Sequence, residues 1–445
     1  MSELPPELTG TPYGAYAYAY PHKTAYRPFA TPVPLRTLWA NAECAARFLY
    51  LHVPFCEMRC GFCNLFTTAN PPGDLPARYL AALQRQAAQV RVALGETRFA
   101  RLAIGGGTPT YLEPSQLHAL FDLAESLGAA PGAIPTSVET SPATATPERL
   151  RVLHERGVSR VSIGVQSLVE TEVAAAGRAQ RTATVEAALA SIRETGFPTL
   201  NIDLMYGLPG QSVASWLGSL RAALRYQPEE LFLYPLYVRP LTGLGRRPDG
   251  RPLDDAGWDE LRLSCYRAAR DLLRAEGYAQ ISMRMFRAAH APIAEEPAYC
   301  CQEDGMVGLG CGARSYTGGL HYASEYAVGA SGVRAILAAY LRAPEAAFAA
   351  AHYGVALSPD DQRRRYLIQS LLQTEGLDRA AYQRRFGRDI LEEIPQLAVL
   401  VEHGLAAAQP GRLRLTAAGV ERSDAIGPWL YTAEVTRLMA AYALR

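Results

Sequence analysis

The sequence predicts an α/β fold in which six β/α units form an open, barrel-like parallel sheet, followed by a small winged-helix-like domain. Between residue 46 and about residue 240, strand-like apolar runs alternate with amphipathic helical patterns at the spacing of β/α units. After residue 358, helical patterns precede a short strand and turn at 412–419 and a final helix. Hydrophobic residues make up 49% of the 445-residue chain, which is enough for a large core.

The predicted strands alternate with helices that lie between them. The strands are expected at residues 47–53, 99–104, 135–139, 158–165, 197–205 and 230–236. The helices are expected near residues 75–94, 114–127, 146–156, 182–195 and 212–226. Pro114 and Thr146 mark two of the helix starts. Units of this kind imply a parallel sheet whose crossovers are right-handed.

The sequence divides the chain into four predicted parts. Residues 1–45 form an irregular N-terminal arm, in which alanine and tyrosine alternate up to Tyr20. The arm is expected to dock on the main body, and a substrate lid is the alternative. Residues 46–290 form the barrel, residues 291–357 a mixed, glycine-rich connection that completes the active site, and residues 358–445 the C-terminal domain.

Charge, hydropathy and cysteine usage exclude several classes of protein. The formal net charge of +1 gives no general attraction to nucleic acid or to an anionic membrane. The chain has no apolar run of 18 residues, and its first residues lack a basic start and an apolar core, so we expect a cytoplasmic protein. Eight cysteines in a long chain, several of them clustered, favour metal binding in a reducing compartment over a disulfide framework.

Three cysteines lie together directly after the first predicted strand. They are Cys56, Cys60 and Cys63, in a C-x3-C-x2-C pattern. Three thiolates can hold an iron–sulfur cluster and leave one iron without a protein ligand, and an open iron is a place for chemistry. Three-quarters of a zinc site is the alternative for the triad taken alone.

Glycines and polar residues follow the other predicted strands. They are Gly105, Gly106, Gly107 and Thr108 after the second strand, Glu139 at the third, Gln166 at the fourth, Asp203 at the fifth, and Tyr234, Tyr237 and Arg239 after the sixth. The carboxyl ends of parallel strands meet at one edge of the sheet, where ligands bind. The sequence therefore predicts a ligand site at this edge.

The residue types suit a polar ligand. Glycines allow a close approach of the backbone and expose N–H groups. Glu139 and Asp203 could accept hydrogen bonds from an amine or from ribose hydroxyls, although each taken singly is more often a structural acceptor. Gln166 and Arg178 could bind carboxylates. The remaining candidates, which could support an adenine ring or the cluster, are the aromatic residues Tyr50 and Phe62.

These motifs resemble the radical S-adenosylmethionine (SAM) superfamily, and most closely its oxygen-independent coproporphyrinogen III oxidase-like (HemN-like) family. The segments that carry the resemblance are Leu49–Cys56, the cysteine triad, Gly105–Leu112, Ser162–Ser167 and Asn201–Pro209. The resemblance implies a partial (β/α)6 TIM-type barrel that holds a [4Fe-4S] cluster. It also implies one-electron cleavage of SAM to a 5′-deoxyadenosyl radical, which abstracts hydrogen from a small-molecule substrate.

The same resemblance implies roles for individual residues. The cluster would be bound by Cys56, Cys60 and Cys63, and SAM would be contacted by Tyr50, Gly106 and Glu139. A second SAM would be contacted by Phe62, Gly107, Thr108, Gln166, Arg178 and Asp203. An electron donor such as flavodoxin or ferredoxin is expected, together with a monomeric state and no nucleic-acid or membrane partner.

The chain departs from the family pattern at four places, of which the first is the Tyr-Pro-His-Lys run at residues 20–23 of the N-terminal arm. Asn64 follows the triad, where the porphyrinogen oxidases continue with Gly-Cys. The segment His321–Tyr326 stands in place of the His-Asn-x-x-Tyr-Trp of the heme-chaperone branch. Arg314 replaces a residue near SAM that is usually apolar.

Four functions are compatible with these observations. They are oxidative decarboxylation of coproporphyrinogen III, methyl transfer from a second SAM, non-catalytic heme binding or trafficking, and DNA binding with an Fe–S sensor. The last is disfavoured because Asp360, Asp361 and Glu392–Glu393 offset the basic run Arg363–Arg365. Other residues are expected to be structural. Arg284 and Arg287 are expected to be a solvated or salt-bridged pair, with a substrate clamp as the alternative, and Cys300 and Cys301 two ordinary thiols, with a second metal site as the alternative. The expected packing residues are Cys44, Cys265 and Cys311.

Overall fold

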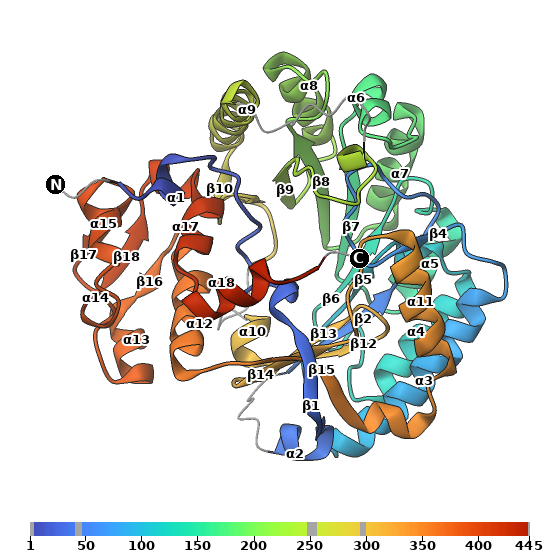
Figure 1. The fold of residues 1–445 in the computed structure, drawn as a ribbon. Helices are drawn as coiled ribbons and strands as arrows, with labels where there is room; N and C mark the ends of the chain where they lie inside the picture. Colours follow the sequence, from blue (N-terminus) through green and yellow to red (C-terminus); the bar gives the residue numbers. More distant parts are fainter. Residues whose placement is uncertain (1–3, 41–46, 247–255, 294–299, 444–445) are drawn as a thin grey trace.

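One large sheet organises the described part of the chain. The computed structural model describes residues 4–40, 47–246, 256–293 and 300–443 (Figure 1). Within these ranges, thirteen strands pair in the order β1-β15-β14-β13-β12-β2-β5-β6-β7-β8-β9-β11-β10. Cys44, for which a packing role is predicted, lies outside them.

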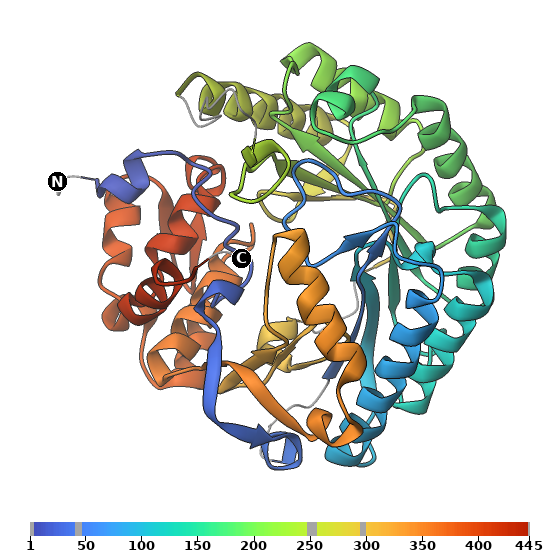
Figure 2. The same ribbon diagram turned by 45° about the vertical axis from the view of Figure 1, so that its right-hand side comes forward.

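The centre of the sheet consists of the six predicted parallel strands in chain order. They are β2 (Arg47–Val53), β5 (Phe99–Gly106), β6 (Thr136–Thr140), β7 (Arg160–Gln166), β8 (Thr199–Tyr206) and β9 (Glu230–Pro235). Neighbours pair in parallel throughout. The sheet curves, and helices cover its convex face (Figure 2). The predicted partial barrel is therefore confirmed.

The covering helices lie close to their predicted positions. They are α3 (Leu75–Leu94), α4 (Pro114–Ser126), α5 (Pro147–Glu155), α6 (Glu170–Ala175), α7 (Thr182–Thr195) and α8 (Val213–Leu224). Pro114 and Pro147 stand at the first positions of α4 and α5, where a missing N–H costs nothing. Leu49, Leu51 and Val53 of β2 are fully buried in the core on this convex side. Because side chains alternate along a strand, Tyr50 and His52 face the concave side.

The expectation of an irregular N-terminal arm is wrong in part. The arm contains α1 (Pro6–Thr9), the 3-10 turn η1 (Lys23–Ala25), strand β1 (Arg27–Pro34) and α2 (Leu35–Ala40). Strand β1 pairs antiparallel with β15 (Ala350–Ala356) at one edge of the sheet. Its three prolines argue against a strand by sequence, but an edge strand tolerates residues that lack an N–H donor.

The connecting region extends the same sheet. Strand β12 (Met306–Leu309) pairs in parallel with β2, and β13 (Arg314–Tyr316) and β14 (Leu320–Ala323) continue towards β15. Helix α11 (Ala330–Arg342) and the 3-10 turn η4 (Glu345–Ala349) precede β15. On the opposite edge, α9 (Ala256–Ala275) leads to the antiparallel strands β10 (Tyr278–Gln280) and β11 (Met285–Ala288). The division at residues 45, 290 and 357 stays a prediction, because a single sheet crosses the first and second of these boundaries.

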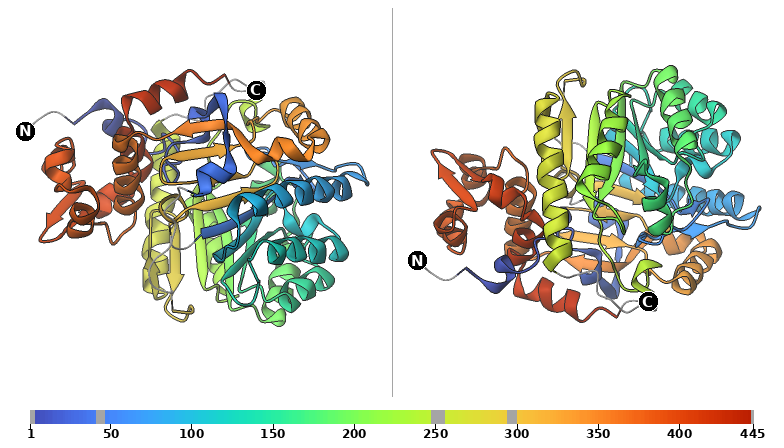
Figure 3. Two further views of the ribbon diagram at one scale, coloured as in Figure 1. Left: turned by 90° about the horizontal axis from the view of Figure 1, so that it is seen from below. Right: turned by 90° about the horizontal axis from the view of Figure 1, so that it is seen from above.

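The C-terminal domain has the predicted order of helices and a small β-element. It begins with α12 (Pro359–Leu371), and its remaining elements are β16 (Leu377–Asp378), α13 (Arg379–Phe386), α14 (Ile390–Glu393), α15 (Leu397–Glu402), β17 (Ala406–Gln409), β18 (Arg412–Leu415), α16 (Ala417–Val420), α17 (Ser423–Trp429) and α18 (Ala433–Ala440). Strands β16, β18 and β17 form a separate sheet. The domain lies beside the barrel as a second lobe (Figure 3).

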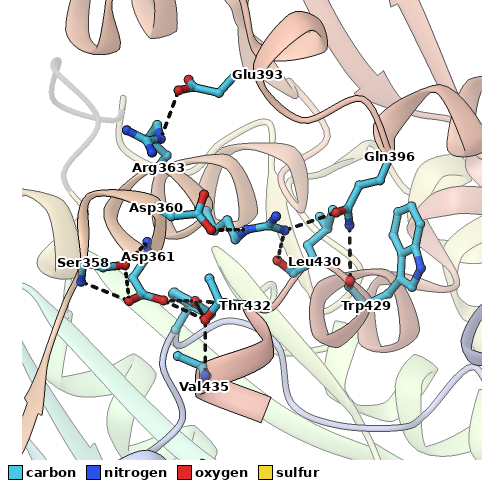
Figure 4. A network of polar contacts seen from close by, with 12 residues as sticks. Ser358, Asp360, Asp361, Arg363, Glu393, Gln396, Trp429, Leu430, Thr432 and Val435 are labelled. Atoms are coloured by element: carbon cyan, nitrogen blue, oxygen red, sulfur yellow. Dashed lines mark hydrogen bonds and ion pairs between the residues drawn. The ribbon is translucent and has the colours of Figure 1, made fainter. Parts of the chain in front are cut away.

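Polar contacts at α12 tie this domain to the arm and neutralise its basic run. Asp361 accepts hydrogen bonds from Tyr20 Oη at 2.7 Å and Thr432 Oγ1 at 2.8 Å. Arg363 pairs with Glu393 at 3.1 Å and Arg364 with Asp360 at 3.1 Å (Figure 4). The third arginine of the run, Arg365, is buried against Glu303 at 2.6 Å. No arginine of the run is thus left to bind a phosphate backbone.

Membrane insertion through a helix has no support in this fold. Among the residues that the structure describes, no helix combines the length and the apolarity that crossing a bilayer requires.

Candidate active site

The three predicted ligands lie on one loop next to the end of β2. Strand β3 (Phe55–Cys56) pairs in parallel with β4 (Thr68–Ala69), and the loop between them carries Cys60 and Cys63. All three thiols are free and half-buried. We call residues 56–67 the cysteine loop.

Gly61 anchors the cysteine loop through its backbone. Its N–H donates to the carbonyls of Ala176 and Gly177 at 3.1 and 3.2 Å, and its carbonyl accepts from Leu244 N at 2.7 Å. A Cβ at this position would lie 2.6 Å from the Ala176 oxygen. Only glycine therefore allows the loop to approach α6 and the segment after β9 this closely.

Replacing Gly61 with alanine is expected to displace the cysteine loop and to reduce cluster loading several-fold, because the new methyl group overlaps a backbone carbonyl. Iron and sulfide per protein after anaerobic reconstitution measure the loading. Gly73→Ala is the matched control, since a Cβ there would meet nothing within 4 Å. Equal iron content in both variants would show that this anchor does not position the ligands.

The donor set fits the proposed cluster. Three free thiols lie on one loop, and a four-iron cluster takes each protein thiolate on a different iron. Burial raises the pKa of the Cys56 thiol to about 12 and also raises that of Cys60. The nearby Arg178 opposes the effect at Cys60, with its Nη1 at 3.2 Å from the sulfur.

The glycine loop after β5 brings the cysteine loop and Glu139 together. Gly106 has a φ of +113°, which favours glycine, and its N–H donates to Glu139 Oε2 at 2.9 Å. A Cβ on Gly105 would lie 2.8 Å from the Glu139 carboxylate, and one on Gly107 would lie 2.5 Å from the Phe55 carbonyl and 3.0 Å from Cys56 Sγ. Thr108 is buried and hydrogen-bonds to Cys56.

The Glu139 carboxyl is surrounded by protein, yet solvent can still reach it. Burial raises its pKa to about 7, although the Gly106 N–H and the positive charge of Arg160 act in the opposite direction. The side chain is nevertheless exposed to solvent, because it stands on the open concave side of the sheet. A carboxyl group that protein surrounds but solvent still reaches is a candidate ligand group.

Three of the six residues expected around a second SAM, namely Gln166, Arg178 and Asp203, lie near Gly164. Arg178 Nη2 donates to the Gly164 carbonyl at 2.8 Å, and Gly164 pairs in register with Asp203 on β8. Gln166 follows with a left-handed φ of +69° in a β-bulge, and its Nε2 lies 3.0 Å from where a Cβ of Gly164 would be. Burial raises the pKa of Asp203 to about 6. Phe62 packs against a small apolar cluster that contains Leu236.

Sequence reasoning missed His52. Tyr50 Oη lies 3.3 Å from His52 Nδ1, and His52 Nε2 lies 3.0 Å from the Phe66 carbonyl. Because a carbonyl only accepts, we assign the proton to Nε2, which leaves Nδ1 to accept from Tyr50. The ring also fills the space that a side chain on Gly106 would need. His52 thus connects the predicted SAM contact Tyr50 to the end of the cysteine loop.

Several predicted residues lie elsewhere or have structural roles. His321 is fully buried with Nε2 at 3.2 Å from Arg365 Nη1, so its imidazole is not available to a heme iron. Arg284 forms a buried ion pair with Asp424, which confirms the salt-bridged alternative for this residue, whereas Arg287 donates to the Pro292 carbonyl. Cys300 and Cys301 are free thiols at the start of α10 (Cys301–Asp304), as expected.

A cavity of about 640 Å³ lies apart from these residues. It is a half-open pocket lined by residues of α11 and of the strands β12–β15, Ser315 among them. None of the residues predicted to bind the cluster or SAM lines it.

Comparisons with known proteins agree with this geometry. The family model described as the radical SAM superfamily matches residues 50–223, and that of the HemN C-terminal domain matches residues 357–421. The chain is 29% identical over 406 residues to the oxygen-independent coproporphyrinogen III oxidase of Cereibacter sphaeroides, covering 85% of this chain and 87% of that protein. It is 32% identical over 276 residues to the heme chaperone HemW of Escherichia coli, covering 60% and 68%. The solved structure of coproporphyrinogen III oxidase (HemN) from Escherichia coli has the same fold, with a TM-score of 0.78 over 93% of this chain and 96% of that one at 24% identity.

Proposed function

Because the chain belongs to the radical SAM superfamily, and within it to the HemN-like family, we propose that it is a radical SAM enzyme that oxidatively decarboxylates a porphyrinogen. Radical SAM proteins bind a [4Fe-4S] cluster and SAM. The observation that carries the proposal is the meeting of the cysteine loop, the glycine loop and Glu139 at one edge of the sheet. The substrate is proposed from the Cereibacter relative, which matches this chain over most of both lengths.

Each part of the site has a task in this proposal. Cys56, Cys60 and Cys63 would hold the cluster, and the anchored Gly61 keeps their loop in place. When bound, the cluster supplies the electron that cleaves SAM, so that a hydrogen atom can be removed from the substrate. The ionised Glu139 would accept a hydrogen bond from the amine of SAM, and the Gly106 N–H holds that carboxylate in position. A protein electron donor such as flavodoxin or ferredoxin would restore the reducing electron.

The first test of the proposal is direct. The anaerobically reconstituted protein, given dithionite, SAM and coproporphyrinogen III, is expected to form 5′-deoxyadenosine and to release CO2. Formation of 5′-deoxyadenosine without CO2 would reject the porphyrinogen as substrate and leave the radical chemistry standing. Absence of both products from cluster-loaded protein would reject the enzyme assignment.

Methyl transfer is the second candidate, and one observation favours it. Gln166, Arg178 and Asp203 gather around Gly164 next to Cys60, where the resemblance places a second SAM. In that case the same assay would yield S-adenosylhomocysteine and a methylated product in place of CO2. Heme trafficking, the activity named for the HemW relative, predicts stoichiometric heme binding without turnover, and the burial of His321 disfavours it.

The affinity for SAM is expected to depend on pH through Glu139. Its pKa of about 7 lies above the usual value, so the carboxylate is present at pH 8 and largely protonated at pH 6. We therefore expect SAM to bind about ten-fold more weakly at pH 6 than at pH 8, measured by anaerobic equilibrium dialysis. Glu139→Gln should remove this dependence, and the control Glu125→Gln on the outer helix α4 should keep it. A flat profile in the unmodified protein would contradict the role of Glu139.

A further inference from the structure

Four buried hydroxyl groups join the end of β6, the segment after the glycine loop and the cysteine loop. Thr140 Oγ1 lies 2.7 Å from Thr110 Oγ1, which lies 2.7 Å from Thr144 Oγ1. Thr144 Oγ1 lies 2.9 Å from Ser141 Oγ, and Ser141 donates to Glu57 Oε1 at 2.7 Å. The four residues that carry these hydroxyl groups are all buried. We call the four the hydroxyl chain, and its last acceptor belongs to the cysteine loop.

The carboxylate at its end sets the direction of the hydroxyl chain. A hydroxyl group has one proton to donate, whereas an ionised carboxylate only accepts. Because Ser141 gives its proton to Glu57, it must accept from Thr144. The same reasoning applies at each earlier hydroxyl group, so all four donate towards the carboxylate. Hydrogen bonds in such a series strengthen one another, and those to a charged acceptor are stronger than neutral ones.

The two ends of the hydroxyl chain adjoin residues predicted to bind SAM and the cluster. Thr140 directly follows Glu139 on β6, and Glu57 directly follows Cys56. Consecutive Cα atoms are about 3.8 Å apart, so each end lies one residue from a predicted ligand group. The hydroxyl chain therefore ties the start of the cysteine loop to the end of β6, whereas Gly61 ties the middle of the loop to the end of α6.

The second carboxylate oxygen of Glu57 lacks a donor. Glu57 Oε2 is buried, and among the residues that the structure describes it has no hydrogen-bond partner. The charge of a carboxylate whose oxygen is removed from water acts more strongly on neighbouring groups than it would in solvent. A negative charge next to Cys56 opposes the addition of an electron to a cluster bound there, because net charge is one of the factors that set the reduction potential of an iron–sulfur cluster.

We propose that Glu57 is a positioning residue for the cluster, held by Ser141 so that it fixes the start of the cysteine loop and adds a negative charge next to the ligand Cys56. The proposal rests on the cluster-binding part of the proposed function and not on its substrate. The hydrogen bond helps to retain the cluster. The charge lowers the reduction potential of the cluster, which makes the reduced cluster a stronger electron donor to SAM. Glu57 belongs to neither of the sets predicted to bind the cluster and SAM.

Two variants separate the hydrogen bond from the charge. Glu57→Gln keeps an acceptor oxygen for Ser141 and removes the charge, whereas Ser141→Ala removes the hydrogen bond and keeps the charge. At a fixed solution potential, Glu57→Gln is expected to raise the ratio of reduced to oxidised cluster about ten-fold, a shift of about 59 mV for one electron, with iron loading unchanged. Ser141→Ala is expected to release iron to a chelator several-fold faster and to shift the potential less. Redox titration followed by EPR and the kinetics of iron release measure the two effects.

Glu113→Gln is the matched control. Glu113 lines the same half-open pocket of about 360 Å³ as Glu57, but it pairs with Arg149 at 3.0 Å. The control should change neither the potential nor the rate of iron release. Circular dichroism and SAM affinity, measured on all variants, are expected to match those of the unmodified protein.

Each measurement can contradict one part of the proposal. An unchanged potential in the Glu57→Gln protein would overturn the role of the charge, and unchanged iron release from the Ser141→Ala protein would overturn the positioning role. Neither measurement needs a substrate. A protein that shows both effects but releases no CO2 from coproporphyrinogen III would therefore reject the proposed function and keep this inference. Unmodified protein that binds no cluster would overturn both.

Discussion

Replacement of Cys60 with alanine is expected to reduce SAM cleavage to the level of cluster-free protein. Cys60 is the central thiol of the triad, and its sulfur lies 3.2 Å from Arg178 Nη1, so its loss removes a proposed ligand and leaves that guanidinium without this contact. A cluster with two remaining protein thiolates is expected to be lost during reconstitution. Iron content, the visible absorption of the cluster and 5′-deoxyadenosine formation measure the effect.

Cys300→Ser is the matched control for this experiment. Cys300 is also a free, half-buried thiol, but it lies at the start of α10 and contacts Gln369 at 3.9 Å. The serine variant should keep its iron and its activity. If the Cys60→Ala protein retained a full cluster and still cleaved SAM, the assignment of the three ligands would be wrong.

The largest expected effect on stability comes from Asp424→Ala. Asp424 on α17 pairs with Arg284, and the two side chains are 0% and 2% exposed. Tyr237 also donates to Asp424, and the rings of Tyr16 and Tyr18 each lie 4.8 Å from the Arg284 guanidinium. Removing the carboxylate leaves a buried charge uncompensated, which costs about 3–5 kcal/mol.

Urea denaturation of the apoprotein measures this loss. Glu434→Ala is the comparison, because Glu434 and Arg437 form an exposed pair with 59% and 66% of their side-chain surface accessible. The unfolding midpoint is expected to stay unchanged there. A similar midpoint for the two variants would mean that the buried pair does not hold the arm, the barrel and the C-terminal domain together.

The sequence was sufficient for the six β/α units because strand-like segments and periodic helical patterns alternate along it at a regular spacing. The cysteine loop, the glycine loop and Glu139 could be predicted in the same way, because each stands at or directly after the end of a predicted strand. It failed for β1, whose prolines hide an edge strand, and for β12–β14, which are only three or four residues long. It also could not bring Ser141 to Glu57, because this contact joins segments that lie 84 positions apart.

The pairing of β1 with β15 also has a consequence for how the protein is made. Arg27 lies opposite Gly354, so the edge strand has no partner until almost four-fifths of the chain has been synthesised. The contacts that cover the cysteine loop are equally distant, since Arg59 donates to Val328 and Tyr326 to Asn64, 269 and 262 positions apart. Contacts of such sequence separation form slowly. During synthesis on the ribosome, the six β/α units are therefore made before the segment around Tyr326 and Val328 that covers the cysteine loop. We expect this segment to cover the loop only late in folding.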